Sequence, residues 1–126
     1  MRYHLLVQPV ALCLTLAWAA SCFAAQLTPA AADEIDHLLS HLQSSGCQFN
    51  RNGDWHDAAD AADHLKKKLN YALDKGAIAS AEDFIDQAAS KSSMSGQAYQ
   101  VRCAQAAPQP SGQWLREELE RYRARQ

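Results

Sequence analysis

Apolar residues recur at helical spacing in four stretches of this chain, and the first stretch lies before Gly46. Its apolar positions are Ile35, Leu38, Leu39 and Leu42. This spacing gives a helix a single apolar face. Thr28 is a suitable N-cap, Pro29 suits the first helical position, and Gly46 suits the end. The pattern predicts an amphipathic helix with one side packed into a core.

The longest helical stretch is predicted over residues 55–75. Asp54 is a suitable N-cap and Gly76 a suitable stop. At about 100° per residue, one face of this helix collects the apolar side chains. They are Trp55, Ala58, Ala59, Ala62, Leu65, Leu69 and Leu73. We expect this face to pack closely against another helix, because three of its residues are alanines.

Two shorter helices are predicted in the second half of the chain. Ser80 begins a capping box, and Phe84, Ile85 and Ala88 form the apolar face of the helix that follows. After a polar loop at 90–96 and a proline-containing linker at 105–111, a C-terminal helix is expected over 112–126, with Ser111 as its cap. Because of that linker, we expect the last helix to dock loosely.

Two segments change from helical spacing to alternation. Cys47 and Phe49 alternate with polar residues, as do Tyr99, Val101 and Cys103. The segment Asn50-Arg51-Asn52-Gly53 predicts a turn after the first segment. We expect the segments to meet as a two-stranded β ribbon. The fold class is therefore mainly α, with about four helices around one small core and a short ribbon.

The first 24 residues are typical of a secretory signal peptide. A basic start at Arg2 precedes an apolar run from Leu5 to Trp18, and small residues lead to a cleavage site after Ala24. Its removal leaves Cys47 and Cys103, which predict one disulfide in an oxidising compartment. This disulfide would staple the ribbon. The residues before Cys22 match a lipoprotein cleavage box poorly, so we do not expect a lipid anchor there.

Charge excludes one class of partner. The chain carries 14 acidic residues against 12 Lys and Arg, and loss of Arg2 with the signal peptide would leave a net charge of −3. Nucleic-acid-binding proteins usually show a basic excess, so we expect no nucleic acid partner. No apolar run after the signal peptide reaches 18 residues, so we expect no membrane span.

The central block of the chain resembles a known family. The pieces that carry the resemblance are Arg51-Asn52-Gly53-Asp54, Ala62-Asp63-His64-Leu65 with Lys68, Ala81-Glu82-Asp83-Phe84-Ile85-Asp86, and Ala89-Ser90-Lys91-Ser92-Ser93 through Gly96 and Tyr99. In order and spacing they are similar to the YfeK-like family of small secreted bacterial proteins, with Ala98 in place of an expected proline. The resemblance implies a Gram-negative periplasmic setting for the domain at 25–104 and carries over no catalytic residue.

Histidines on two helices are candidates for chemistry. His37 and His41 have the i,i+4 spacing of paired zinc ligands, but no Glu follows His37 as a zinc-protease motif requires. We interpret both as surface histidines beside the apolar face.

The polar face of the predicted second helix is a candidate contact surface. It contains Asp57, Asp60, His64, Lys67, Lys68 and Tyr71. Asp60 lies one turn before His64, so a hydrogen bond between them would raise the pKa of His64. A solvated charged face explains this pattern equally well, except for the tyrosine.

The serine-rich loop offers a second candidate surface. It carries Lys91 but neither a Ser-x-x-Lys motif nor a nucleophile elbow, so we expect binding rather than catalysis. The segment from Ser95 to Tyr99 also matches the Ser-Gly-x-x-Tyr element of periplasmic lysozyme inhibitors. Arg51 has no role in the turn and is free to pair with a carboxylate.

Together these features predict a non-enzymatic periplasmic binding or interaction module with no cofactor and no metal. Its partner would be an envelope protein or a small ligand. The candidate interaction residues are Arg51, Asp60, His64, Tyr71, Lys91, Ser92, Ser93 and Tyr99. Two alternatives are an inhibitor of a cell-wall hydrolase such as lysozyme, and a small hydrolase or metal-binding protein.

Overall fold

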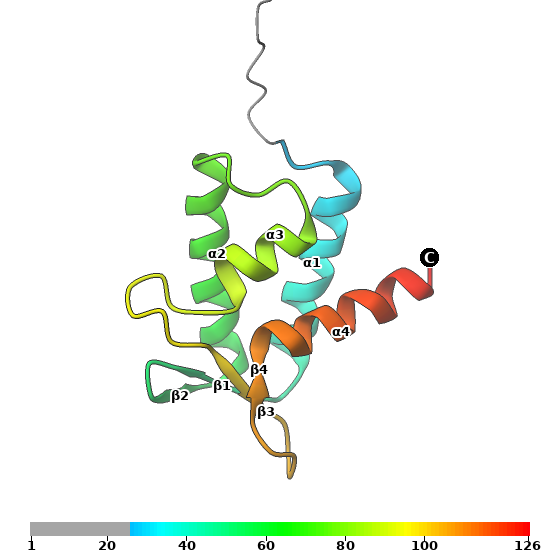
Figure 1. Ribbon diagram of the computed structural model, residues 1–126. Helices are drawn as coiled ribbons and strands as arrows, with labels where there is room; N and C mark the ends of the chain where they lie inside the picture. Colours follow the sequence, from blue (N-terminus) through cyan, green and yellow to red (C-terminus); the bar gives the residue numbers. More distant parts are fainter. Residues whose placement is uncertain (1–25) are drawn as a thin grey trace, which may run out of the picture.

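A computed structural model describes residues 26–126 of the protein as a helical domain with a small sheet at one end (Figure 1). The elements in chain order are α1 Pro29–Ser44, β1 Gln48–Arg51, β2 Asp54–His56, α2 Ala58–Asp74, α3 Ala81–Phe84, the π-helix η1 Ile85–Ala89, β3 Gln100–Arg102, β4 Gln109–Pro110 and α4 Ser111–Ala124. The predicted fold class is confirmed. The predicted signal peptide at 1–24 and the lipidation site at Cys22 lie outside the described residues.

Helix α1 begins and ends as its sequence predicts. The Thr28 hydroxyl accepts a hydrogen bond from the Ala31 amide at 3.1 Å, and Pro29 occupies the first turn. The chain leaves the helix at Gly46, whose φ of +67° favours glycine. All four predicted apolar positions of this helix are buried. Helix α1 lies beside α2 (Figure 1). Helix α3 packs against α1, and η1, which follows it directly, packs against α2.

The start of α2 differs from the prediction. Asp54 does not cap a helix at Trp55. Instead, the segment Asp54–His56 is strand β2, which pairs with β1 in an antiparallel hairpin. The hairpin closes at Asn52 and Gly53, both with positive φ, which is the backbone of a two-residue hairpin turn. Helix α2 begins at Ala58, three residues after its predicted start at Trp55. Its cap is Asp57, whose side chain accepts a hydrogen bond from the Asp60 amide at 2.8 Å.

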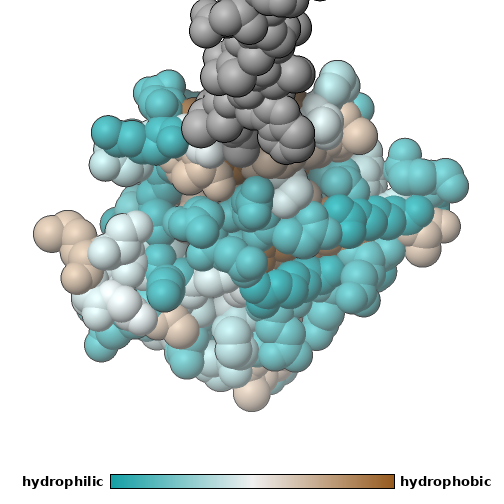
Figure 2. All heavy atoms as spheres, turned by 45° about the horizontal axis from the view of Figure 1, so that its top comes forward, coloured by the Kyte–Doolittle hydropathy of each residue, from teal (hydrophilic) through white to brown (hydrophobic). Residues whose placement is uncertain are grey.

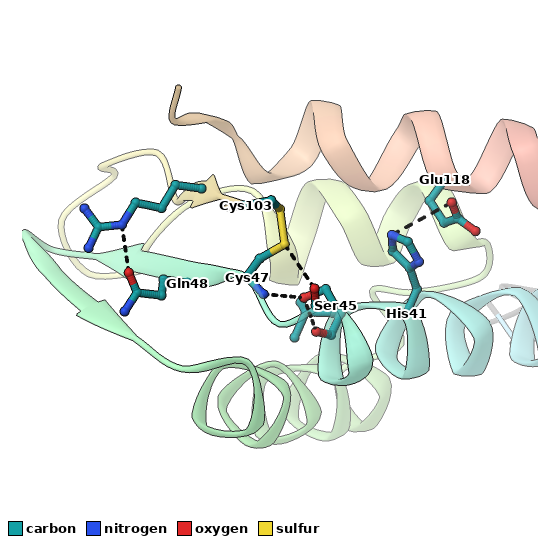
Figure 3. Close-up of a disulfide and its surroundings, with 8 residues drawn as sticks. His41, Ser45, Cys47, Gln48, Cys103 and Glu118 are labelled. Carbon is teal, nitrogen blue, oxygen red and sulfur yellow. Dashed lines mark hydrogen bonds and ion pairs between the residues drawn. A yellow bond between two sulfur atoms is a disulfide. The ribbon is translucent and has the colours of Figure 1, made fainter. Parts of the chain in front are cut away.

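The sheet contains the predicted ribbon and two further strands. Its order is β2-β1-β3-β4, with all pairs antiparallel, and Phe49 of β1 faces Val101 of β3. The predicted disulfide joins Cys47 to Cys103 with a Cα–Cα distance of 4.4 Å (Figure 3). Because Cys47 directly precedes β1 and Cys103 directly follows β3, the bridge ties the beginning of β1 to the end of β3.

Helix α4 is part of the main core, so the expectation of loose docking is wrong. Trp114, Leu115 and Leu119 are buried in the same cluster as the apolar residues of α1 and α2. Ser111 also differs from its predicted role. It is the first residue of the helix, and its buried hydroxyl has no hydrogen-bond partner among the described residues, while Pro110 occupies the cap position.

Polar residues cover most of the visible surface in Figure 2, with isolated hydrophobic residues between them. Between residues 26 and 126, none of the helices combines the length and apolarity needed to cross a lipid bilayer.

Candidate functional site

Three polar side chains, two from α2 and one from the residue just before β3, form a hydrogen-bonded cluster. His64 and Lys68 lie one helical turn apart on α2, and both reach the hydroxyl of Tyr99. The His64 Nε2 atom lies 3.2 Å from the Tyr99 hydroxyl oxygen, and the Lys68 Nζ atom lies at the same distance from it. Lys68 also donates to the Lys91 carbonyl oxygen at 2.8 Å. The polar face of α2 is thus tied to the serine-rich loop.

The backbone around Tyr99 holds this phenol in place. The Tyr99 amide donates to the Ser90 carbonyl oxygen, and the Ser111 amide donates to the Tyr99 carbonyl oxygen, each at 2.9 Å. Only 6% of Tyr99 is exposed. The hydroxyl therefore approaches α2 from a rigid position between the end of η1 and the start of α4.

Arg51 at the end of β1 adds a cation without a partner. The side chain is half-buried, and its guanidinium has no hydrogen bond or ion pair to any residue between 26 and 126. Every other arginine of this region has a side-chain partner. They are Arg102, Arg116, Arg121, Arg123 and Arg125. A half-buried guanidinium that no residue from 26 to 126 pairs is a site for an acceptor on a ligand.

Ser92 contributes a hydroxyl to the same place. It is 5% exposed, and its oxygen accepts hydrogen bonds from the amides of Met94 and Ser95 at 3.3 and 3.2 Å. The Ser92 oxygen also lies 3.5 Å from the side-chain nitrogen, Nδ2, of Asn52. These contacts use the oxygen only as an acceptor, so the hydroxyl hydrogen remains available to donate. Ser95 in turn donates to Asn52 at 2.6 Å and holds the loop against the β1–β2 turn.

These groups line one pocket of about 370 Å³, a volume that suits a small ligand. Its lining residues are Arg51, Asn52, His64, Lys68, Ser92, Ser93, Met94 and Tyr99. No aspartate or glutamate is among them. A larger groove continues along α2 and shares three of these residues, His64, Lys68 and Ser93.

Burial and the neighbouring cations keep the site's histidine neutral. Burial, followed by the positive charges of Arg51 and Lys68, lowers the pKa of His64 to about 4. Burial is also the main cause that lowers the pKa of Lys68, and the positive charge of Arg51 adds to it. Burial raises the pKa of Tyr99. At neutral pH the imidazole is therefore uncharged and the phenol is protonated, so Lys68 donates to the phenol oxygen and the phenol can donate to His64.

The prediction of a hydrogen bond between Asp60 and His64 is wrong. The His64 ring bonds to Tyr99, and the pKa of His64 moves down rather than up. Asp60 is exposed, and its amide instead takes part in the helix cap at Asp57. The reason is the serine-rich loop, which covers this part of α2 and replaces water around the imidazole with protein.

The structure brings together five of the eight predicted interaction residues: Arg51, His64, Ser92, Ser93 and Tyr99. Tyr71 lies in the adjoining groove, 68% exposed. Lys91 contributes only its carbonyl oxygen, and its exposed side chain lies at a different pocket with Asp86 and Arg116. The Ser-Gly-x-x-Tyr element is divided, because Ser95 and Gly96 are exposed whereas Tyr99 is buried.

Two polar residues of the pocket are absent from the eight predicted interaction residues: Lys68, which was expected only as part of the polar face of the second helix, and Asn52, which was expected only in a turn. Lys68 had a signal, since it follows His64 at i+4 and must share its face of the helix. Asn52 reaches the pocket only because its turn closes a hairpin, whereas the sequence predicts a helix directly after this turn. Among residues 26–126, no three His, Cys, Asp or Glu side chains are grouped as metal ligands would be.

A second polar cluster joins α1 to α4. The carboxylate of Glu118, only 5% exposed, lies 2.8 Å from His37 Nε2 and 3.8 Å from His41 Nε2 (Figure 3 shows His41 directed toward Glu118). Tyr122 stacks on the His37 ring with centroids 4.1 Å apart. The interpretation of these histidines as solvated surface residues is therefore wrong, because α4 covers them.

Comparison with known proteins adds the family. Residues 29–123, from α1 to α4, match a family of unknown function (DUF5329). The chain belongs to this family. A relative in Salmonella typhimurium, described as uncharacterized protein YfeK, is 39% identical over 92 residues, which cover 71% of this chain and 70% of the relative. The resemblance to the YfeK-like family is thus confirmed. No solved structure matches the chain.

Proposed function

We propose that this protein is a non-enzymatic binding module of the periplasm, and that its ligand occupies the pocket between α2, the β1–β2 turn and the serine-rich loop. The observation that carries this proposal is Arg51, a half-buried arginine without a partner among residues 26–126, which lies beside a second half-buried cation, Lys68. A binding site supplies charges and donors that only the ligand satisfies, and this pocket has that composition.

The hydrogen bonds of the pocket favour binding over catalysis. His64, the natural general base, lies beside a phenol held by Lys68, and the Ser92 oxygen accepts backbone N–H groups. A serine nucleophile would instead donate its hydroxyl to the imidazole. The side chains therefore support recognition of a ligand rather than catalysis.

The Cys47–Cys103 bridge supports the proposed compartment. Disulfides persist in oxidising compartments such as the bacterial periplasm and are rare in the cytosol. The predicted signal peptide at 1–24 agrees with this assignment.

Retention of a ligand from an envelope extract tests the binding proposal. The purified wild type should retain a small molecule detectable by native mass spectrometry, or a protein recovered by affinity capture. Arg51→Gln and Lys68→Met should lose it. Lys66→Met is the matched control, because Lys66 is exposed on α2 and lines no part of the pocket. Retention by all three variants would contradict the proposal.

A further inference from the structure

We infer that the pocket binds the phosphate group of a phosphorylated organic ligand, with Arg51 and Lys68 as counter-charges and Ser92 as a neutral donor. This inference rests on the proposed function and names the chemistry of the ligand. It depends on the hydrogen-bond donors of the pocket that have no acceptor among the described residues, on the charge of these donors, and on the groove that adjoins the pocket.

The unused donors of the pocket converge from three different elements. Arg51 on β1 retains its full set of N–H groups. The Lys68 ammonium has three N–H groups, and its contacts with Lys91 and Tyr99 use two of them. The buried Ser92 hydroxyl retains its hydrogen. A ligand group that accepts from three directions fits this arrangement, and a phosphate has three terminal oxygens.

The charge of the pocket favours a dianion over a carboxylate. Arg51 and Lys68 together carry two positive charges, and no carboxylate lines the pocket to offset them. A ligand carboxylate would balance one of them, whereas a phosphate monoester carries a charge of about −1.5 to −2 at neutral pH. Arginine also matches phosphate geometry with two parallel N–H bonds, and lysine serves as a point charge.

The adjoining groove indicates where the rest of the ligand lies. Besides the shared residues, the groove is lined by Lys67, Tyr71 and Lys75 of the α2 region. The Tyr71 ring is 68% exposed, and the Lys75 Nζ atom lies 5.5 Å from its centroid. An exposed aromatic ring next to a phosphate pocket offers contact area to an organic moiety. A phosphate ester should therefore bind more tightly than inorganic phosphate.

Titration of the full folded domain by NMR tests this inference at constant ionic strength. The probes are inorganic phosphate, glycerol 3-phosphate and acetate. Both phosphates should shift the amide signals of residues 92–96, and acetate should bind at least about tenfold more weakly. Arg51→Gln and Lys68→Met should each weaken phosphate binding about tenfold or more, while Lys66→Met should match the wild type.

Vesicles distinguish a soluble ligand from a lipid headgroup. Sedimentation with phosphatidylcholine vesicles that contain phosphatidic acid, lost in Arg51→Gln, would identify a lipid phosphate as the source. Binding of glycerol 3-phosphate without vesicle binding would identify a soluble ester. Both outcomes support the inference.

Absence of binding to every phosphate probe, or equal binding of acetate, would overturn the phosphate inference. The proposed function would survive that result if Arg51→Gln still lost the ligand captured from the envelope. Unchanged capture by Arg51→Gln would instead overturn the proposed function, so the two failures are distinguishable.

Discussion

His64 illustrates how one covered imidazole makes stability depend on pH. Its surroundings include Arg51 of β1, His56 of β2, Lys67 and Lys68 of α2, and the Tyr99 phenol. Burial is the largest cause of its low pKa of about 4 against an ordinary value of 6.5, and the cations act in the same direction. Between these values the unfolded chain therefore binds more protons than the folded protein.

This difference predicts that the free energy of unfolding is highest above about pH 6.5 and falls as the pH drops toward about 4. The loss should be on the order of 1 kcal/mol per pH unit or less, because the side chain is partly exposed to solvent. Urea unfolding of the wild type and of His64→Gln measures it as a difference between two pH profiles. Parallel profiles would contradict the prediction.

In an NMR titration, Asp60→Asn should leave the pKa of His64 unchanged.

At the scale of the element, the beginning of α2 is set by its cap rather than by its apolar pattern. Asp57 accepts the hydrogen bond from the Asp60 amide, whereas Asp54 lies in strand β2. Asp57→Ala should therefore lower the free energy of unfolding by about 1 kcal/mol. Asp54→Ala is the matched control and should change it by only a few tenths of a kcal/mol. Denaturant unfolding of both variants measures the two effects. A larger loss of stability in Asp54→Ala than in Asp57→Ala would place the start of the helix at Trp55.

The packing of α4 on α1 depends on a buried carboxylate. Burial would raise the pKa of Glu118, but hydrogen bonds from His37 and Arg121 outweigh it and lower the pKa to about 2. Stability from this ionised group is present above its ordinary value of 4.5 and is lost as the pH falls toward 2.

Glu118→Gln should therefore lower the free energy of unfolding by about 2 kcal/mol near neutral pH, because the positive charges around it lose their counter-charge. Glu120→Gln is the control, since Glu120 is exposed on the same helix. Chemical unfolding at neutral and acidic pH measures both variants. An equal effect of the two substitutions would show that the buried carboxylate does not stabilise α4.

At the scale of the whole molecule, one bridge closes most of the domain. The bonded cysteines are 56 residues apart, and the hairpin, α2, α3 and η1 all lie between them. In the chain-entropy model, a loop of this length contributes roughly 4 kcal/mol by restricting the unfolded chain. The bridge is therefore a large part of the stability of so small a domain.

Cys47→Ser should lower the free energy of unfolding by about 2–5 kcal/mol, and a reductant should destabilise the wild type similarly. Thermal unfolding with and without reductant measures both effects. The double variant Cys47→Ser with Cys103→Ser is the control, and reductant should not change its melting temperature. A wild-type melting temperature that does not respond to reductant would mean that the bridge contributes nothing to stability.

Much of this fold could be predicted from local patterns. The cap at Thr28, the helical spacing after it, the cap at Ser80 and the alternation before Cys103 all act within a few residues, and all are confirmed. The Asn52-Gly53 pair also carried a local hairpin signal. The predicted turn is confirmed, but a helix rather than a strand was predicted after it. The apolar spacing of α2 extends back to Trp55, and a short strand and a first helical turn cannot be separated by spacing alone.

The candidate site was predictable only in its components. Arg51, His64 and Tyr99 were predicted interaction residues, but Arg51 lies on β1, His64 on α2 and Tyr99 directly before β3. Their distances depend on strand pairing and on the loop that covers α2. For the same reason the sequence suggested Asp60 as the partner of His64, since only a neighbour on the same helix is visible in a sequence.

The sequence by itself determined the helices with strong caps, the mainly α class and the pairing of the two cysteines, because these follow from backbone preferences and residue type over short distances. Only the tertiary structure decided which polar groups are buried and what they face. Burial is a property of packing between distant segments, and it reverses the effect expected from neighbours in sequence. In this protein it lowers the pKa of His64, encloses Glu118 between α1 and α4, and places Arg51 at the wall of a pocket with no partner from the described part of the chain.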